Sequence, residues 1–282
     1  MGLDLVVAGD WRFKESIALK AAGKVLKKYF ELTGFRLSDP TAVMIAPLPV
    51  GVGSTKWRAE TRGSTVLLLI DPAAPFRNWI GQLGVIFTHE LLHLWVPNSL
   101  RFEGEYDWFF EGFTLYIALR TALDLKIINF REFLDTLARV YDSYLSNPDE
   151  LSLVDASERR WTTAGTFLYD KGMLAAFVYD LAIRTEFGIK TTLAGKYREL
   201  FAHYGAADIN GNDVIIGMLG SSPALKDFTK SYIEKSTRLE LESLLPAYGL
   251  TLDSSGSSSK LSVSRELNSN QKRLLNSLGY RD

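Results

Sequence analysis

Cysteine is absent from this chain of 282 residues. Disulfide bonds and catalysis by a thiol are therefore excluded, although the absence of cysteine does not fix the cellular compartment. An excess of one charge is also missing, because 32 Lys and Arg residues stand against 33 Asp and Glu residues, for a formal net charge of −1. This balance gives no reason to expect nucleic acid or an anionic membrane as the main partner.

Long apolar runs are missing as well. The longest, such as residues 65–70, have the length of a strand, whereas a membrane-spanning helix needs about 20 apolar residues. We therefore expect a soluble protein without a membrane span. Residues 1–4 lack the basic and apolar regions of a signal peptide, but a leader that has been removed is compatible with this sequence, so cytoplasmic and exported locations both stay open.

Two of the three histidines stand four residues apart, in the motif H-E-x-x-H at 89–93. On an α-helix, residues four apart lie about 40° apart around the axis and about 6 Å along it, so His89 and His93 project toward a common point. Apolar neighbours predict that this helix is buried, and buried ionisable groups need a partner. A metal ion provides one, whereas a lone histidine on such a face is usually a core residue.

A carboxylate for the same ion is expected from a second helix. Glu111 stands in the aromatic stretch Trp-Phe-Phe-Glu-Gly-Phe-Thr at 108–114, where an unpaired charge would be unfavourable. Two histidines, one carboxylate and one open position are typical of a catalytic zinc site. We therefore predict that His89, His93 and Glu111 hold one Zn²⁺, with Glu90 close by without being a ligand. The alternative for Glu111 is a place on the helix surface.

The remaining pattern divides the chain into a mixed α/β first part and a helical second part. Residues 253–259, which are Asp, Ser and Gly, have the composition of a flexible linker. We expect an α+β fold with a catalytic lobe over 1–125, a helical lobe over 126–252, and a linker and short tail over 253–282. The expected strands are 3–8, 42–46 and 64–70, and the expected helices are 11–32, 78–95, 108–125, 130–145, 162–187, 193–204, 213–219 and 223–235.

The segments at 89–98 (His-Glu-Leu-Leu-His-Leu-Trp-Val-Pro-Asn) and 108–116 (Trp-Phe-Phe-Glu-Gly-Phe-Thr-Leu-Tyr) resemble gluzincin metallopeptidases of the aminopeptidase N group. Those enzymes carry H-E-x-x-H-x-W-x-x-N and a later W-x-x-E-G-F-x-x-Y. Tyr-Asp-Lys-Gly at 169–172 and the C-terminal helices resemble the related glycyl aminopeptidase family more closely. The similarity covers roughly residues 11–252.

This resemblance implies a thermolysin-like zinc-peptidase lobe, with a mixed sheet and the active-site helices, packed on a helical lobe. Zinc would lie between the two lobes. The family's metal ligands correspond to His89, His93 and Glu111, and its general base corresponds to Glu90.

The resemblance also implies that Tyr169 stabilises the transition state and that Glu60 binds the free amine of the substrate. From the residues alone, Tyr169 would be a packing residue on a half-buried helix, and Glu60 a solvated charge before a strand. Residues 56–59 (Lys-Trp-Arg-Ala) lack the glycines that the family has there, which leaves recognition of a free amine open.

Several other polar residues have local interpretations. Asp107 is expected to cap the helix that follows it. Thr114 and Asn98 are either hydrogen-bond partners of the ligands or local caps. His203 has no partner motif and is expected to be structural.

These observations predict a zinc metallopeptidase that acts on peptides, with an aminopeptidase as the first interpretation. An endopeptidase or another amide hydrolase on the same site is an alternative, and so is a peptide-binding module without turnover. The presence of Glu90 and Tyr169 argues against the last, because binding alone does not require them. The sequence does not indicate the oligomeric state.

Overall fold

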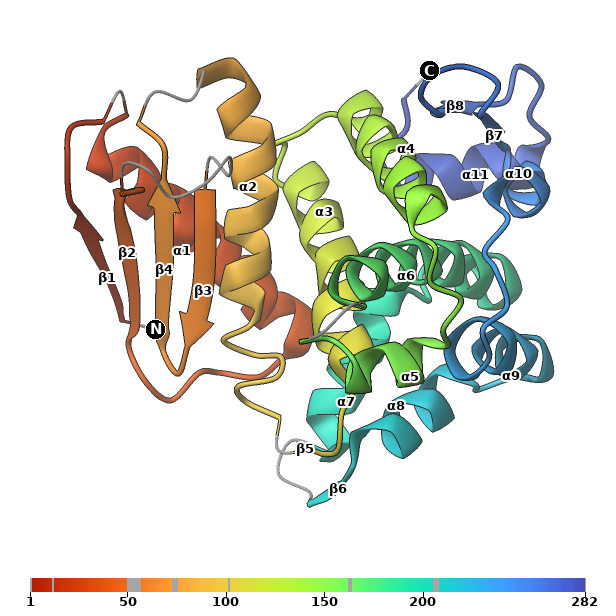
Figure 1. Ribbon diagram of the computed structural model, residues 1–282, viewed down its shortest axis with the longest axis horizontal. Helices are drawn as coiled ribbons and strands as arrows, with labels where there is room; N and C mark the ends of the chain where they lie inside the picture. The colour runs from red at the N-terminus through yellow and green to blue at the C-terminus, as the bar shows by residue number, and fades with distance from the viewer. Residues whose placement is uncertain are drawn as a thin grey trace.

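The fold is α+β, as the sequence predicts, with a mixed sheet followed by a series of helices (Figure 1). The computed structural model describes residues 2–11, 13–49, 57–72, 76–100, 102–161, 164–204 and 208–281, with the backbone alone for 76–83. Among these residues, no helix has the length and apolar character that crossing a membrane requires.

A four-stranded sheet has the order β1-β2-β4-β3. Its strands are β1 (Leu3–Val7), β2 (Thr41–Pro47), β3 (Trp57–Arg62) and β4 (Thr65–Ile70). The first three in spatial order run parallel, and β3 returns antiparallel beside β4. The turn between them begins at Gly63, whose φ of +54° favours glycine. The sequence pattern missed β3, because this edge strand is rich in charged and exposed side chains.

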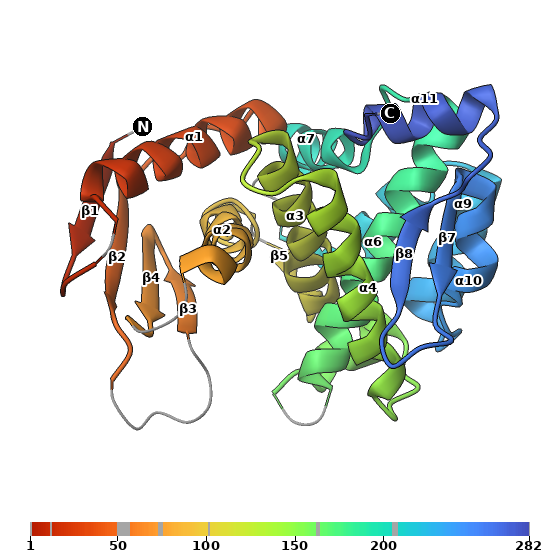
Figure 2. The ribbon, with the colours of Figure 1, turned by 90° about the horizontal axis from the view of Figure 1, so that it is seen from above.

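Two helices connect the sheet to the rest of the molecule. Helix α1 (Glu15–Thr33) buries Ala22, Val25, Leu26 and Tyr29 at helical spacing and ends at Gly34, as expected. The Tyr29 hydroxyl donates a hydrogen bond of 2.7 Å to the backbone oxygen of Thr88, just before the H-E-x-x-H motif. Helix α2 (Phe76–Leu92) lies beside β3 and β4, as Figure 2 shows from above.

The element that carries Glu111 is π-helical where the sequence predicts an α-helix. Residues Trp108–Phe113 form the π-helical segment η1, and α3 (Thr114–Asp124) continues it. Strand β5 (Phe102–Glu103) precedes η1 and pairs in parallel with β6 (Ile209–Asn210). Short π-helical segments are rare and frequently occur at functional sites.

Helix α6 (Gly165–Phe187) is the centre of the helical part, because it is buried along most of its length and contacts η1, α3, α4, α5, α7, α9 and α11. Of residues 253–259, expected as a linker, Asp253 ends β7 and 254–259 connect the hairpin strands β7 and β8, and β8 packs on α4 (Figure 2). The sequence pattern did not predict α5 or β7. The remaining elements are α4 (Phe130–Ser146), α5 (Leu153–Glu158), α7 (Leu193–Tyr204), α8 (Gly211–Leu219), α9 (Pro223–Thr229), η2 (Lys230–Glu234), α10 (Leu241–Leu244), η3 (Leu245–Tyr248), β7 (Leu250–Asp253), β8 (Lys260–Val263) and α11 (Ser269–Ser277).

A pair of glycines sets the separation of η1 and α6. A Cβ atom on Gly112 would lie 2.5 Å from the Cα atom of Gly172, and one on Gly172 would lie 2.8 Å from the Cα atom of Gly112. Side chains do not occupy such positions, so the two backbones touch only because both residues are glycine. This contact brings Glu111 on η1 near Tyr169 on α6.

Replacing Gly172 with alanine is expected to lower the free energy of unfolding by about 1–3 kcal/mol, because overpacking forces the two backbones apart. Urea denaturation measures this change. Gly23→Ala is the matched control, since a Cβ atom there meets nothing within 4 Å inside α1. That control is expected to gain stability from helix propensity. A Gly172→Ala protein as stable as the unsubstituted one would contradict the close contact.

Candidate metal centre

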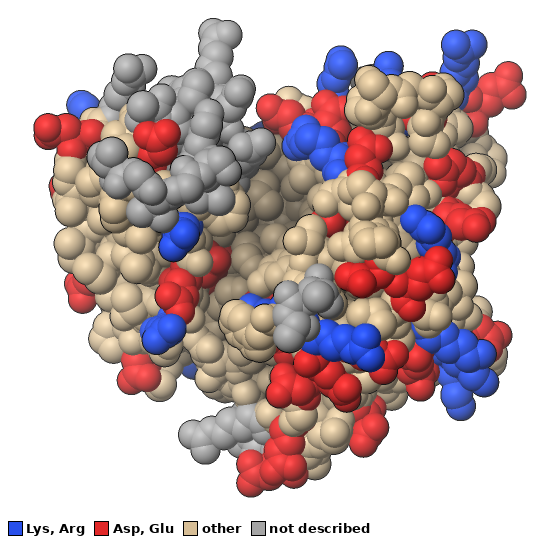
Figure 3. All heavy atoms as spheres, in the orientation of Figure 1, with Lys and Arg blue, Asp and Glu red and all other residues tan. Residues whose placement is uncertain are grey.

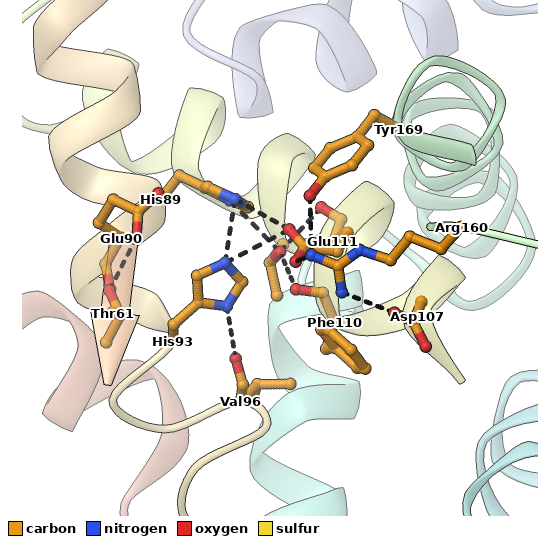
Figure 4. Close-up of polar contacts among 11 residues, drawn as sticks. Thr61, His89, Glu90, His93, Val96, Asp107, Phe110, Glu111, Arg160 and Tyr169 are labelled. Carbon is orange, nitrogen blue, oxygen red and sulfur yellow. Dashed lines mark hydrogen bonds and ion pairs between the residues drawn. The ribbon is translucent and has the colours of Figure 1, made fainter. Parts of the chain in front are cut away.

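Three donor atoms converge between α2 and η1 (Figure 4). The Nε2 atoms of His89 and His93 lie 3.1 Å apart. The Oε2 atom of Glu111 lies 3.2 Å from the first and 3.4 Å from the second. Ligand atoms about 2.0–2.1 Å from a tetrahedral zinc ion lie about 3.3–3.4 Å from one another, which is close to this spacing. The structure therefore brings together the three residues that the sequence suggested, and their role as ligands stays a prediction.

The other ring nitrogen of each histidine has a partner that leaves Nε2 able to accept a metal. Nδ1 of His93 lies 2.9 Å from the backbone oxygen of Val96, which can only accept. Nδ1 of His89 lies 3.4 Å from the Thr114 hydroxyl, whose own proton is directed to the backbone oxygen of Phe110 at 2.6 Å. Such partners fix the tautomer and orientation of a metal-binding imidazole. Of the two local candidates, Thr114 therefore contacts a histidine, whereas Asn98 donates to the backbone of the β3–β4 turn.

The buried histidines and glutamates of this cluster change one another's pKa values. His89, Glu90, His93 and Glu111 are between 5% and 8% exposed. Burial lowers the pKa of His93, but the hydrogen bond and negative charge of Glu111 raise it more. Burial also acts to raise the pKa of Glu111, but hydrogen bonds to both imidazoles hold it well below its ordinary value. The buried carboxylate thus requires positive charge beside it, and an arginine supplies this at Oε1. The other oxygen, Oε2, and the two imidazole nitrogens form a donor set that a divalent cation fits.

Glu90 lies beside the three converging donor atoms, and its carboxylate is held by a residue of β3. Its carboxylate, together with the two imidazoles, offers ligand atoms that all lie within 4.8 Å of one another. Its Oε2 atom accepts a hydrogen bond of 2.8 Å from the hydroxyl of Thr61 on β3. Since Glu111 rather than Glu90 contacts both imidazoles, the geometry favours Glu111 as the third ligand and leaves Glu90 beside the site.

Arg160, which the sequence analysis did not single out, joins the metal centre to the helical part. Its Nη2 atom donates to Oε1 of Glu111 at 2.5 Å and to the Tyr169 hydroxyl at 3.1 Å. Its Nη1 atom donates to Oδ1 of Asp107 at 2.6 Å. The expected cap at Asp107 is wrong, because this residue has helical backbone angles and its carboxylate pairs with Arg160 instead.

The two residues implied by family resemblance have different surroundings. Tyr169 is half-buried on α6, and burial together with the charge of Glu111 raises its pKa, so its hydroxyl keeps its proton. Glu60 is mostly exposed, and its Oε1 atom pairs with Nε of Arg62 at 2.6 Å. Because side chains alternate along a strand, Glu60 shares a face with Arg62, while Thr61 points the other way. The roles of Tyr169 and Glu60 stay predictions. The ring of His203 bonds to the backbone of Glu199, one turn earlier on α7.

A cleft of about 1450 Å³ opens onto these residues. Figure 3 shows it as a hollow between the part that holds the sheet and α2 and the part that holds α4 and α6. All of β3 lines one wall, and Arg160, Trp161 and Tyr169 line the other. This volume exceeds the range of about 300–1,000 Å³ that is usual for small-molecule pockets, so a chain-like ligand fits it better.

Asp170, on the cleft wall beside Tyr169, is expected to lower stability at neutral pH. Burial raises its pKa to about 6, and its Oδ2 atom has no hydrogen-bond partner among the described residues. The folded protein therefore holds this proton more tightly than the unfolded chain does. The stability that this bound proton contributes is fully present below about pH 4 and is lost as the pH rises through about 6.

Asp170→Asn is accordingly expected to raise the free energy of unfolding by about 1–3 kcal/mol at pH 7 and to change it little at pH 4. Urea denaturation of both proteins between pH 4 and pH 7 measures the difference. Asp39→Asn, at an exposed position, controls for the loss of one negative charge. An equal effect of Asp170→Asn at both pH values would contradict the raised pKa.

No family model matches the sequence, and no curated protein matches it. Solved structures do match. An aminopeptidase N family protein from Idiomarina loihiensis aligns with 89% of this chain and 48% of its own, at 21% identity and a TM-score of 0.72. An M1 zinc metallopeptidase from Deinococcus radiodurans aligns with 84% of this chain and 49% of its own, at 16% identity and a TM-score of 0.56. A mutant of the latter is known bound to a Tyr-Ser-Ala substrate.

The chain thus spans about half the length of the structures that it matches. At these identities the likeness establishes the fold, and it confirms the α+β class with a sheet followed by helices. It also places the H-E-x-x-H motif of this chain in a fold that M1 zinc metallopeptidases share.

Proposed function

We propose that this protein is a zinc-dependent metallopeptidase that removes residues from the N-terminus of peptides. The observation that carries the proposal is the convergence of His89, His93 and Glu111 within 3.1–3.4 Å, beside Glu90 and on the wall of a long cleft. The fold shared with M1 zinc metallopeptidases supports it.

The chemistry follows from the side chains around this point. A zinc ion, when bound, supplies a Lewis acid and lowers the pKa of water to about 7. Glu90 takes a proton from the attacking water and passes it to the leaving amine. Thr61 holds one oxygen of that carboxylate, which leaves the other for the water. The protonated Tyr169 donates a hydrogen bond to the oxyanion that develops on the substrate.

The exposed edge of β3 suits an extended peptide, because an edge strand has backbone groups without a partner strand. In this proposal Glu60 binds the free amine of the substrate, which replaces Arg62 as its partner. The likeness of residues 169–172 to the glycyl aminopeptidase family favours this assignment. We further propose that the cleft separates lobes of residues 1–125 and 126–252, with 253–282 packed on the second.

One observation favours an endopeptidase, or a hydrolase of another amide, as the second candidate. Glu60 is mostly exposed and already paired with Arg62, so the amine site is not preformed. A peptide-binding module without turnover is a weaker candidate, because Glu90 and Tyr169 both lie beside the three converging donors, where binding alone does not need them.

A pair of tripeptides separates these functions. The zinc-loaded protein is expected to hydrolyse a free tripeptide and to hydrolyse its N-acetylated form at least about 10²-fold more slowly, since an amine-binding carboxylate is then left unpaired. A chelator is expected to abolish hydrolysis, and one equivalent of Zn²⁺ to restore it. Equal rates on both peptides would indicate the endopeptidase, and a zinc-loaded protein inactive on a broad peptide library would contradict an enzyme.

A further inference from the structure

We propose that Arg160 is a positioning residue that fixes both Glu111 and Tyr169 relative to the metal centre. Its role in hydrolysis rests on the proposed function, whereas its role in shaping the metal site does not. Figure 4 shows the guanidinium on the side of Glu111 opposite to the two histidines, between Tyr169 and Asp107.

Arg160 divides the two oxygens of Glu111 between two tasks. Oε1 accepts from the guanidinium at 2.5 Å, while Oε2 faces the two imidazole nitrogens at 3.2 and 3.4 Å. A charge-assisted hydrogen bond of this kind is strong and directional. The carboxylate therefore presents a single oxygen to the ion. Without the guanidinium it would be free to rotate about its last side-chain bond and to offer both oxygens or neither.

The same nitrogen also orients Tyr169. A guanidinium has only donors, so the phenol oxygen must accept the 3.1 Å hydrogen bond from Nη2. The proton of the hydroxyl then points away from the guanidinium, where the Glu111 carboxylate can accept it, and a group in the cleft competes with Glu111 for it. Because one atom contacts both residues, Arg160 couples the direction of the Tyr169 proton to the orientation of the Glu111 carboxylate.

Three contacts hold the guanidinium itself in place. Asp107 binds Nη1 at 2.6 Å, and the guanidinium lies 4.5 Å from the ring centre of Trp161 and 5.4 Å from that of Phe110. The side chain is only 15% exposed. Arg160 follows α5, whereas Glu111 belongs to η1 and Asp107 precedes it, so the cluster ties the segment after α5 to η1. A lysine cannot span Asp107, Glu111 and Tyr169, because its ammonium is a compact point charge.

Cobalt binding tests the first part of the proposal without any need for activity. In the Co²⁺-loaded protein, visible absorption reports the number and geometry of the ligands. Arg160→Ala and Arg160→Lys are expected to change this spectrum and to weaken Co²⁺ binding by about 10- to 100-fold. Arg131→Ala, at an exposed position on α4, removes the same charge and is expected to match the unsubstituted protein.

A spectrum and affinity unchanged in Arg160→Ala would overturn the proposal. Arg160→Lys keeps the positive charge near the two buried carboxylates, so it provides the test if Arg160→Ala does not fold. If peptide hydrolysis is absent from every protein but the cobalt spectrum changes, the proposed function fails and this inference stands. If hydrolysis is present and the cobalt spectrum is unchanged, the proposed function stands and this inference fails.

A double-substitution cycle tests the coupling to Tyr169. Arg160→Ala alone is expected to lower kcat by about 10- to 100-fold with a smaller change in KM. In the Tyr169→Phe background the same substitution is expected to lower kcat by less than about 10-fold, because the hydroxyl that it orients is gone. An equal fall in both backgrounds would contradict an action through Tyr169.

Discussion

Replacing Glu90 with glutamine is expected to lower kcat for peptide hydrolysis by about 10²- to 10⁴-fold while zinc stays bound. Glutamine has the size of glutamate and can still accept the 2.8 Å hydrogen bond from Thr61. Its amide cannot take a proton from water at neutral pH, so the general base is lost. The three converging donors, His89, His93 and Glu111, are unchanged, and the zinc content should therefore remain close to one equivalent.

Steady-state kinetics on a free tripeptide, with elemental analysis of the same sample, measures both quantities. Glu132→Gln is the matched control, because glutamine at this position still completes the capping box at the start of α4. A zinc-loaded Glu90→Gln protein that turns over at the normal rate would show that Glu90 is not the base. Loss of zinc from Glu90→Gln would instead make Glu90 a ligand, which its place within 4.8 Å of the imidazoles permits.

The sequence identified three residues that lie together in the folded chain, because the decisive information is local, and their roles stay predictions. Four residues along one helix fix the relative placement of His89 and His93, whatever the rest of the chain does. An acidic residue in a strongly apolar segment also needs a partner, and this drew attention to Glu111. The fold class followed from the change of hydrophobic period along the chain, from strands near the N-terminus to helices after it.

What the sequence missed depends on contacts between distant segments. Arg160 meets Glu111 and Asp107 across 49 and 53 positions, and no motif or periodicity marks it. Thr61 reaches Glu90 from an edge strand whose exposed, charged composition hid the strand itself. Only the folded chain places these side chains beside the motif.

The hydrophobic pattern also did not predict that η1 is π-helical. A π-helical segment and an α-helix place apolar residues so similarly over six positions that periodicity does not separate them. The contact between Gly112 and Gly172 was equally invisible, because a glycine inside a helical pattern lowers confidence in a helix without indicating what approaches it. Together these features decide how near Glu111 and Tyr169 come.

Replacing Tyr169 with phenylalanine is expected to lower kcat by about 10²- to 10³-fold, with a much smaller change in KM. The substitution keeps the ring, which packs against the core from α6, and removes only the hydroxyl. That hydroxyl is protonated, since burial and Glu111 raise its pKa, and Arg160 already occupies its oxygen as an acceptor. Its proton is therefore the part that a developing oxyanion can accept in place of the Glu111 carboxylate, and its loss should affect the transition state more than the bound substrate.

Steady-state kinetics on a free tripeptide measures kcat and KM separately, and cobalt absorption checks that the metal site is intact. Tyr179→Phe is the control, because its hydroxyl makes a buried hydrogen bond of 2.8 Å to the backbone of Leu219, away from the cleft. Removal of a buried hydrogen bond usually lowers stability, so this control is expected to be less stable. Its kcat is expected to be unchanged, because the hydroxyl lies away from the cleft. A rise in KM without a fall in kcat for Tyr169→Phe would assign the hydroxyl to substrate binding. An unchanged kcat and KM would reduce Tyr169 to a packing residue, which is the interpretation that the isolated sequence left open.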